Sequence, residues 1–396
     1  MRLKSALLLA FLLALAACGT SSERSAAGPT TGATGGPAEN RGAGLPPGFH
    51  LSVFAEGLGG ARFMAFGPDG VLYVTSIRDG KVLALPDRNH DGRADEVITF
   101  AENLLSPHGL AWHDPDGIGA GGWLYVGESH QVIRLRDTDG DLRADERQVV
   151  IPDLPAGEMH FTRTVGFGPD GGLYVSVGSS CNACKEADPR RAAILRLPAE
   201  ALAQAGCNPD GSGMEIYARG LRNAVGFTWH PERKELWATD NGRDWLGDDL
   251  PPDDLDLVVR GGDYGWPYCY GNRVPDSEMG SAARYASTLP ATFELPAHSA
   301  PLGLEFYTGT MFPAEYRGDL FIAFHGSWNR SVPTGYKVVR VRFRNARPVA
   351  MEDFVDVWFK GGRVTHRPVD VKTGPVGALY ISDDRGGTIF RLTYGK

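Results

Sequence analysis

The sequence predicts an all-β protein, a six-bladed β-propeller, and two observations carry this prediction. A turn rich in proline and glycine separates two apolar runs of alternating polarity, and this arrangement occurs six times. The six turns lie at residues 66–70, 114–117, 167–171, 229–233, 312–318 and 374–377. Six copies over residues 45–396 average about one per 55 to 60 residues, which is the spacing of propeller blades with long loops.

Other fold classes explain the sequence less well. Glycine and proline interrupt most windows that would otherwise form helices, and only residues 191–205 predict a short helix. A β-sandwich would also contain alternating strands, but it gives no reason for a repeated turn.

The first 44 residues predict targeting rather than structure. Residues 1–17 have a basic start and an apolar run too short for a comfortable membrane span, and they precede Cys18 as in a bacterial lipoprotein cleavage site. An ordinary secretory signal with an incidental cysteine is the alternative. Residues 18–44 are rich in small residues and proline and predict a flexible tether, which leaves residues 45–396 for the propeller. We therefore expect a protein anchored by a lipid on Cys18 to the bacterial cell envelope, on its periplasmic or extracytoplasmic face.

The charge of the chain argues against nucleic acid as a partner. The sequence has 40 Lys and Arg against 48 Asp and Glu, and removal of residues 1–17 takes away Arg2 and Lys4 but no acidic residue. The formal net charge then moves from −8 to about −10. An acidic chain without a basic run does not attract phosphate backbones.

The cysteines after Cys18 are candidates for disulfides. They are Cys181, Cys184, Cys207 and Cys269. An exported protein can form disulfides, but four cysteines allow three pairings that the sequence does not distinguish. Lys185 follows the Cys-Asn-Ala-Cys motif where a c-type haem attachment site has histidine, so this motif does not predict haem.

Two acidic loops have the oxygen-rich start of a calcium-binding loop. In the first, residues 87–96, Asp87, Asn89 and Asp91 alternate along the chain before a glycine. The second, residues 137–146, repeats this pattern without that glycine. Neither loop has glutamate at the twelfth position, where an EF-hand carries its bidentate ligand. Bound calcium and a solvated hairpin tip therefore both remain interpretations.

The most informative segment runs from residue 218 to residue 269. It places Arg222 and Asn223 directly before a predicted strand, which ends in the acidic loop Asp240-Asn241-Gly242-Arg243-Asp244. This loop is rich in oxygen donors. An arginine beside a loop that suits a hard cation fits an anionic ligand held against a metal.

This segment resembles the soluble pyrroloquinoline quinone (PQQ) sugar dehydrogenases, the glucose/sorbosone dehydrogenase family. The resemblance rests on Gly-Leu-Arg-Asn at 220–223, Asp-Asn-Gly at 240–242, Gly-Gly-Asp-Tyr-Gly-Trp-Pro at 261–267, His-Gly-Ser-Trp-Asn-Arg at 325–330 and the placement of His160. It covers nearly all of residues 45–396. The Cys-Asn-Ala-Cys motif, with residues 189–194, resembles the sorbosone-dehydrogenase-like branch.

The resemblance implies roles for three residues. His160 would be the catalytic base that takes a proton from the substrate hydroxyl while hydride passes to PQQ, and histidine suits this role because it titrates near neutral pH. Arg222 would stabilise negative charge on the reduced quinone, and Asn223 would orient the cofactor. A histidine packed at a strand entrance and a surface arginine are the alternatives that the residues leave open.

The resemblance also implies two metal sites. Calcium beside the cofactor would be held by the backbone carbonyls of Gly242 and Arg243, although Arg243 stands where the family has proline. A second, structural calcium would be held by Asp254 with carbonyls near Tyr264 and Tyr270. A solvated acidic loop is the alternative for that second site.

Cations for the carboxylates of PQQ would come from Arg330, Lys337 and Arg367, of which Lys337 is equally explained as a solvated strand residue. Two further histidines and two tryptophans have patterns that fit either the channel or ordinary packing. They are His108, His298, Trp266 and Trp328.

The sequence therefore predicts oxidation of an aldose or related sugar with PQQ and calcium as cofactors. Electrons would pass to an external acceptor, a quinone or a cytochrome, because the chain has no haem site. Val225 stands where the glucose-oxidising members have glutamine, so the sugar stays open. A non-catalytic propeller that binds a glycan or a protein is one alternative. A calcium-dependent hydrolase of the lactonase type is another, but it would need side-chain ligands from several blades.

Overall fold

The computed structural model describes residues 44–114, 122–157, 159–204 and 213–395. They belong to one compact unit, which spans residues 38–396. The predicted lipoprotein signal, Cys18, Cys207 and all of the predicted tether except Gly44 lie outside the described residues, so the membrane anchor stays a prediction. Within the described part of the chain, no helix has the length and apolar character needed to span a membrane.

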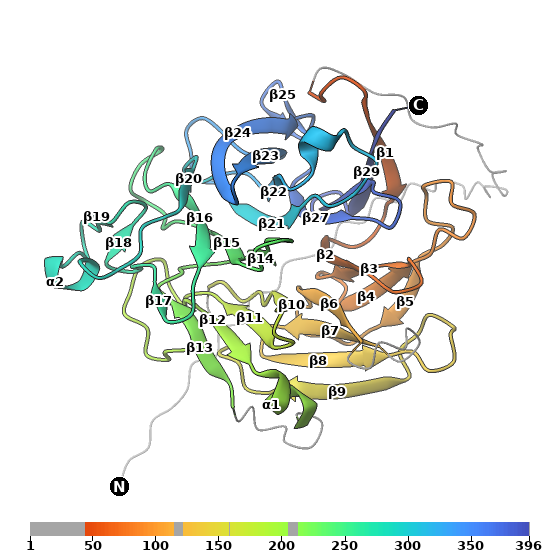
Figure 1. Ribbon diagram of the computed structural model, residues 1–396, viewed down its shortest axis with the longest axis horizontal. Helices are drawn as coiled ribbons and strands as arrows, with labels where there is room; N and C mark the ends of the chain where they lie inside the picture. Colours follow the sequence, from red (N-terminus) through yellow and green to blue (C-terminus); the bar gives the residue numbers. More distant parts are fainter. Residues whose placement is uncertain (1–43, 115–121, 158, 205–212, 396) are drawn as a thin grey trace, which may run out of the picture. The chain divides into compact units, whose positions relative to one another are not determined.

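Six sheets form the blades of a β-propeller, which confirms the predicted fold class (Figure 1). Each blade has four antiparallel strands, which follow sequence order from the innermost strand outwards except in the last blade, whose outermost strand comes from the start of the propeller. Most innermost strands of neighbouring blades contact one another. The innermost strands are β2 (Ala61–Phe66), β6 (Leu110–His113), β10 (Val165–Phe167), β14 (Gly226–Trp229), β21 (Pro301–Phe306) and β27 (Pro368–Thr373).

The second strands of the blades are buried on both faces. They are β3 (Leu72–Ser76), β7 (Trp123–Glu128), β11 (Leu173–Val177), β15 (Leu236–Asp240), β22 (Leu320–Phe324) and β28 (Leu379–Asp383). Every residue of these six strands is buried, including those at alternate positions. Both faces are covered because each blade packs between two others.

The outer strands complete the blades. The third strands are β4 (Lys81–Leu85), β8 (Gln131–Arg136), β12 (Ala193–Leu197), β16 (Asp253–Val258), β23 (Lys337–Arg344) and β29 (Thr388–Tyr394). The fourth strands are β5 (Ile98–Ala101), β9 (Glu146–Ile151), β13 (Glu215–Arg219), β20 (Phe293–Leu295), β24 (Arg347–Val355) and β1 (Phe49–Ala55). The remaining elements are β17 (Gly262–Asp263), β18 (Cys269–Tyr270), β19 (Val274–Pro275), β25 (Phe359–Lys360), β26 (Arg363–Val364), α1 (Ala199–Gln204), α2 (Ala282–Tyr285) and the 3-10 helix Ala314–Tyr316.

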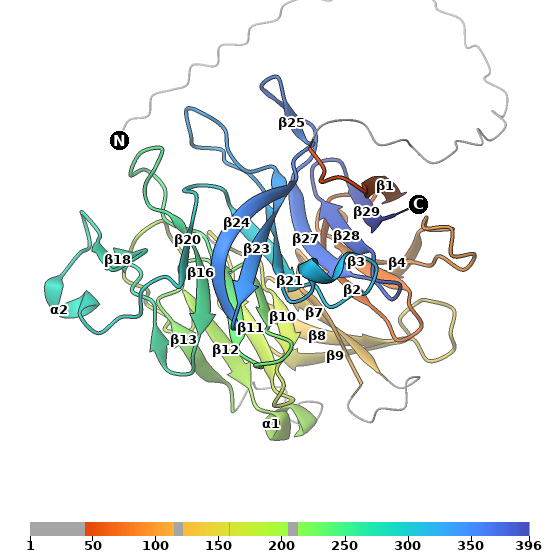
Figure 2. The same cartoon turned by 45° about the horizontal axis from the view of Figure 1, so that its top comes forward.

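The repeated turn found in the sequence connects the first and second strand of every blade. The turn at 66–70 joins β2 to β3, and the turn at 374–377 joins β27 to β28. The sequence repeat is therefore one half of each blade. Strand β17 pairs in parallel with β13, while β18, β19 and α2 project from the outer edge of the ring beside β20 in both views (Figure 2).

The ring is closed by the first described strand. β1 is antiparallel to β29, so the last blade combines strands from both ends of the propeller. Phe49 of β1 is 1% exposed, and its ring centroid lies 4.8 Å from that of Phe312 and 4.9 Å from that of Phe354. These edge-to-face contacts bury the joint in apolar surface.

Hydroxyl groups on the second strands join neighbouring blades near the channel. Thr75 Oγ1 accepts the Phe63 N–H at 3.2 Å and donates to the carbonyl of His108, at the start of the next blade, at 2.8 Å. Thr239 Oγ1 makes the same pair of bonds to Gly226 N and Leu302 O.

Ser382 Oγ accepts the Asp370 N–H at 3.0 Å and donates to Arg62 O in the first blade at 2.5 Å. In the third blade Thr164 Oγ1 donates to Val225 O of the fourth. The hydroxyls of Thr75, Thr239 and Ser382 each accept from an inner-strand N–H and donate to a carbonyl of the next blade, so each satisfies two buried polar groups at once.

Two expectations need correction. The helix predicted at 191–205 is short, because residues 193–197 form β12 between β11 and β13, and only Ala199–Gln204 is helical. Strand pairing and burial override the helix propensity of this segment. Cys181 and Cys184 form a disulfide, but Cys269, also a disulfide candidate, is a free thiol buried against Thr288.

Replacement of Thr239 by valine tests the hydroxyl contacts. The variant keeps the shape of the side chain but leaves Leu302 O and Gly226 N without their partner. We therefore expect the free energy of unfolding to fall by about 1–3 kcal/mol. Urea denaturation measures this loss. Thr393→Val, on the periphery of β29, is the matched control and should change stability by less than about 0.5 kcal/mol. Equal effects of the two substitutions would contradict the assigned role.

Candidate active site

A cavity of about 220 Å³ lies where the segments leading into β10, β14 and β21 meet. It is lined by Met159, His160, Arg222, Asn223, Asn241, Gly242, Asp244, Asp253, His298, Ala300, Trp328 and Asn329. A larger hollow of about 520 Å³ lies beside β13 and β17, but neither His160 nor Arg222 lines it. The smaller cavity is therefore the candidate active site, because it unites side chains that the sequence predicted for chemistry.

His160 is held in one orientation at this cavity. Its Nδ1 lies 2.9 Å from Ser179 Oγ and 3.0 Å from Ser179 O. Ser179 Oγ donates its own hydrogen to Cys181 O at 2.7 Å, so both Ser179 oxygens accept from His160 Nδ1–H. Nε2 is therefore the unprotonated ring nitrogen, which is the state that a general base requires.

The backbone of His160 is also fixed. Its φ is 51°, in the left-handed region that non-glycine residues seldom adopt. The buried Arg163 donates to the His160 carbonyl at 2.9 Å and holds this conformation. Burial, together with the positive charge of Arg222, lowers the pKa of His160 to about 3. The imidazole is therefore neutral at physiological pH.

Arg222 is 4% exposed, and acceptors within the protein occupy all of its N–H groups. Nε donates to Asn182 O at 3.0 Å, and Nη1 donates to Asn241 O at 3.1 Å and to Gly242 O at 2.8 Å. Nη2 donates to Asn182 Oδ1 at 2.9 Å and forms an ion pair with Asp244 at 3.1 Å. The guanidinium therefore has one defined orientation, as the site of an anionic ligand needs.

Buried carboxylates hold the loop around Gly242. Asp240 Oδ2 accepts the Arg222 N–H at 2.8 Å, and Asp253 accepts from Gly242 N at 2.9 Å and from Ala300 N at 3.0 Å. Burial raises the pKa of both aspartates to about 7. Asp244 pairs with the guanidinium, whereas Asp240 and Asp253 accept from backbone N–H groups nearby, so a divalent cation beside Gly242 would favour the charged forms of these carboxylates.

Asn223 and His160 approach each other across Gly178. A Cβ added to Gly178 would lie 2.5 Å from His160 Cβ and 2.8 Å from Asn223 Oδ1. Any side chain at this position would therefore push the two residues apart. The structure thus brings together His160, Arg222, Asn223 and Gly242, four of the residues that the sequence predicted for one site.

Arg243 extends away from the cavity. Its Nη1 contacts both carboxylate oxygens of Asp276, at 2.9 and 2.8 Å, and its Nη2 contacts Glu278 at 3.2 Å. The side chain ties this loop to the segment after β19. The Arg243 side chain is therefore not a candidate metal ligand. Its backbone carbonyl remains a candidate, as the sequence predicted.

The predicted second calcium site contains an unpaired buried oxygen. Asp254 Oδ1 is buried and has no hydrogen-bond partner. Burial and the charges of Asp256 and Asp240 raise the pKa of Asp254 well above its usual range. Tyr264 donates to Leu257 O at 2.6 Å and so lies against the same strand. This donor set fits a hard cation; the roles of the Tyr264 and Tyr270 carbonyls stay predictions.

The first acidic loop hydrogen-bonds to itself. Asp87 Oδ2 accepts from Gly92 N at 3.1 Å, Asn89 and Asp91 accept from the following backbone, and Asp87 Oδ1 is buried without a partner. In the second loop, three carboxylates have oxygens within 4.8 Å of one another. They are Asp137, Asp139 and Asp145. Calcium in either loop stays a prediction.

The structure does not place the three predicted PQQ cations in the cavity lining. Arg330 pairs with Asp249 at 3.1 Å, and Lys337, in the third strand of its blade, pairs with Asp353 at 2.7 Å. Arg367 donates to His325 O at 3.0 Å, one blade away. Lys337 is a strand residue with a cross-strand partner, the alternative that the sequence left open. Arg367 comes directly before the innermost strand β27.

The other histidines and tryptophans divide between packing and the cavity. His108 is fully buried between Arg62 and Thr164, and Trp266 donates to Asn182 O at 3.4 Å. His298 and Trp328 line the cavity. Trp328 is 66% exposed and forms an edge-to-face pair with Trp245, which is 69% exposed.

The sequence predicted no role for four residues whose hydrogen bonds fix the side chains and loops of the site. They are Ser179, Asn182, Asp244 and Asp253. Asp253 was detectable in part, because it precedes Asp254 and successive strand residues point to opposite faces. For Asn182, its position between two cysteines was the available signal.

The comparisons with known proteins agree with this geometry. The sequence profile of the glucose/sorbosone dehydrogenase family matches residues 125–391. An uncharacterized protein of Borreliella burgdorferi is 30% identical over 371 residues, which cover 89% of this chain and 91% of that protein. The aldose sugar dehydrogenase YliI of Escherichia coli is 26% identical over 270 residues, 64% of each chain.

Solved structures share the fold at lower identity. A calcium structure of a Trichoderma reesei carbohydrate-active enzyme of family AA12 has a TM-score of 0.75 and 22% identity, covering 89% of this chain and 96% of that one. The holo form of the PQQ domain of Coprinopsis cinerea pyranose dehydrogenase has a TM-score of 0.73 and 21% identity, covering 90% and 98%.

Fold and site together define a β-propeller of the sugar dehydrogenase class. The chain belongs to the glucose/sorbosone dehydrogenase family.

The lowered pKa of His160 makes a prediction about stability and pH. Between pH 6.5 and about pH 3 the unfolded chain protonates this histidine and the folded chain does not, so stability falls as the pH is lowered through this window. On going from pH 7 to pH 4.5, we expect the free energy of unfolding of His160→Gln to fall by about 1–2 kcal/mol less than that of the wild type. Urea midpoints at the two pH values measure the difference, and equal losses would contradict the assignment.

Proposed function

We propose that this protein oxidises an aldose or a related sugar with PQQ and calcium as cofactors. The observation that carries the proposal is the cavity that unites a neutral, oriented His160 with Arg222 and the Gly242 loop. The surplus of buried carboxylates there fits a divalent cation, and Arg222 with Asn223 fits an anionic quinone. The PQQ and calcium forms of the structural neighbours support both cofactors.

Each residue of the candidate site has its own role in the proposed reaction. When bound, PQQ supplies a quinone that accepts hydride from the substrate carbon. His160 Nε2 takes the proton of the substrate hydroxyl, while Ser179 keeps Nδ1 protonated and the ring in place. Arg222 offers fixed positive charge where negative charge develops. Gly242, with the Arg243 carbonyl, would hold the calcium.

We also propose a surface that binds the sugar, a class of electron acceptor and a location for the protein. The exposed pair Trp245 and Trp328 at the cavity offers an aromatic surface for the ring of a sugar. Electrons would leave to an external acceptor, a quinone or a cytochrome. The lipoprotein signal in the sequence supports a location at the bacterial cell envelope, with the protein held by lipid on Cys18.

Titration of PQQ into the purified protein with Ca²⁺ tests the proposal. We expect saturable binding, followed through the quinone absorbance, and dye reduction with some members of a panel of aldoses and sorbosone. His160→Gln should bind PQQ within about threefold of the wild type but lose at least about 100-fold in turnover, because it cannot take the proton. Absence of binding at micromolar PQQ would instead favour a non-catalytic propeller. Turnover retained by His160→Gln would exclude it as the base.

The unpaired oxygen of Asp254 makes a separate prediction about calcium. We expect Ca²⁺ to raise the melting temperature of the wild type by several degrees, because binding to the folded state alone stabilises it. Asp254→Asn should remove most of this shift, while Asp91→Asn in the first acidic loop should retain it. Differential scanning fluorimetry with and without EDTA measures both. Loss of the shift in Asp91→Asn alone would place the calcium in that loop.

A further inference from the structure

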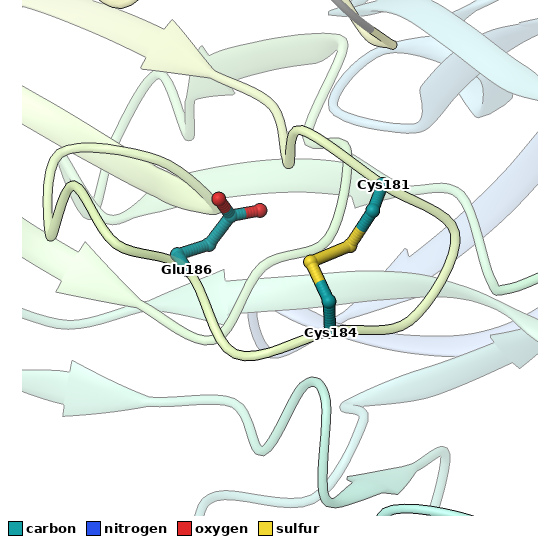
Figure 3. Close-up of side chains that lie close together, drawn as sticks. All are labelled: Cys181, Cys184 and Glu186. Carbon is teal, nitrogen blue, oxygen red and sulfur yellow. A yellow bond between two sulfur atoms is a disulfide. The ribbon is translucent and has the colours of Figure 1, made fainter.

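One short loop contacts both reactive side chains of the candidate site. It connects β11 to β12, and the Cys181–Cys184 disulfide closes it, with a Cα–Cα distance of 6.1 Å (Figure 3). Figure 3 shows the Glu186 carboxylate turned towards the disulfide. Glu186 accepts from Ser180 N at 2.7 Å and from Ser180 Oγ at 2.8 Å. The base of the loop is thus tied together by a covalent bond and two hydrogen bonds.

Asn182, between the two cysteines, makes an unusual number of contacts to the site. Its Oδ1 accepts from Arg222 Nη2 at 2.9 Å and from Asp244 N at 2.8 Å. Its Nδ2 donates to Asp244 O at 3.1 Å. Its carbonyl accepts from Arg222 Nε at 3.0 Å and from Trp266 Nε1 at 3.4 Å. Asn182 therefore binds one edge of the Arg222 guanidinium. It also fixes the backbone of Asp244, the ion-pair partner of Arg222.

These contacts fix the orientation of the positively charged Arg222 guanidinium. A free arginine side chain populates many rotamers, and ordering it costs conformational entropy. Asn182 supplies two of the five acceptors around Arg222, and Asn241, Gly242 and Asp244 supply the others. Removal of the Asn182 amide would leave one N–H of a buried cation unpaired, so the guanidinium would shift or admit water.

The disulfide explains how a loop can hold such a geometry. Residues 181–184 lie outside the strands, so no ladder of hydrogen bonds fixes them. The cross-link removes alternative backbone conformations of this segment. The same loop presents Ser179, whose oxygens orient His160. The loop between β11 and β12 therefore contacts Arg222 through Asn182 and His160 through Ser179.

We propose that Asn182, presented by the disulfide-closed loop 181–184, is a positioning residue that fixes the guanidinium of Arg222. The role in catalysis rests on the proposed function, whereas the role in holding Arg222 does not. The two parts are therefore tested by different measurements.

The first measurement needs neither PQQ nor sugar. Phenylglyoxal modifies accessible arginines, and peptide mass spectrometry locates the products. We expect Arg222 to be protected in the wild type and modified at least about fivefold faster in Asn182→Ala. Asn182→Asp keeps an oxygen at the Oδ1 position and should restore most of the protection. Asn272→Ala, on an exposed turn, is the matched control, and the buried Arg243 should stay protected throughout.

The second measurement uses the protein loaded with PQQ and Ca²⁺. Asn182→Ala should lower kcat about tenfold and change KM for the sugar less than about threefold, because the guanidinium is misplaced and the sugar pocket remains. Asn182→Asp should recover part of kcat. Equal modification of Arg222 in wild type and Asn182→Ala would overturn the proposal. Lack of PQQ binding by the wild type, with the modification result as expected, would overturn only the proposed function.

The contribution of the disulfide is tested by reduction. Dithiothreitol converts the disulfide to two thiols and is itself oxidised to its cyclic disulfide. We expect reduced wild type and the Cys181→Ser, Cys184→Ser double variant to show the same faster modification of Arg222. The reductant should have no effect on the double variant, in which Cys269 remains a free thiol. Full protection of Arg222 after reduction would show that Asn182 holds its position without the cross-link.

Discussion

The structure depends on the hydrogen bonds that join neighbouring blades at the channel. A propeller buries the inner strands of all its blades, so every N–H and carbonyl that leaves a sheet there must find another partner. Thr75, Thr239 and Ser382 meet this requirement with one hydroxyl each, which accepts within its own blade and donates to the next. The Ser382 bond to Arg62 also closes the ring between the two ends of the chain.

The candidate site is built on this closed ring. Because the inner strands are fixed relative to one another, the segments that precede them meet at one place. His160 comes before β10, Asn223 before β14 and Ala300 before β21, and all three line one cavity. Residues far apart in the sequence therefore form a site without a dedicated domain. Asp253 links the segment before β21 to the loop after β15, because it accepts from the backbone N–H groups of Ala300 and Gly242.

Electrostatics give this cavity its chemical character. Burial alone would favour neutral groups, and it leaves His160 neutral and raises the pKa of Asp240 and Asp253. Arg222 stays charged because carbonyls and Asp244 surround it. A neutral histidine, a fixed guanidinium and buried carboxylates therefore lie together at one cavity.

The sequence by itself determined the blade number, because each turn repeat is a local feature fixed by glycine and proline. It also predicted the Arg222 and Asn223 pair and His160 as site residues, since short motifs carry them, and all three line one cavity. Only the tertiary structure decided which cations and acids share the cavity. Lys337 and Arg330 look equivalent to Arg222 as isolated cations, yet Asp353 and Asp249 engage them elsewhere. The part played by Asn182 depends on a contact across 40 residues of chain, which no local pattern reports.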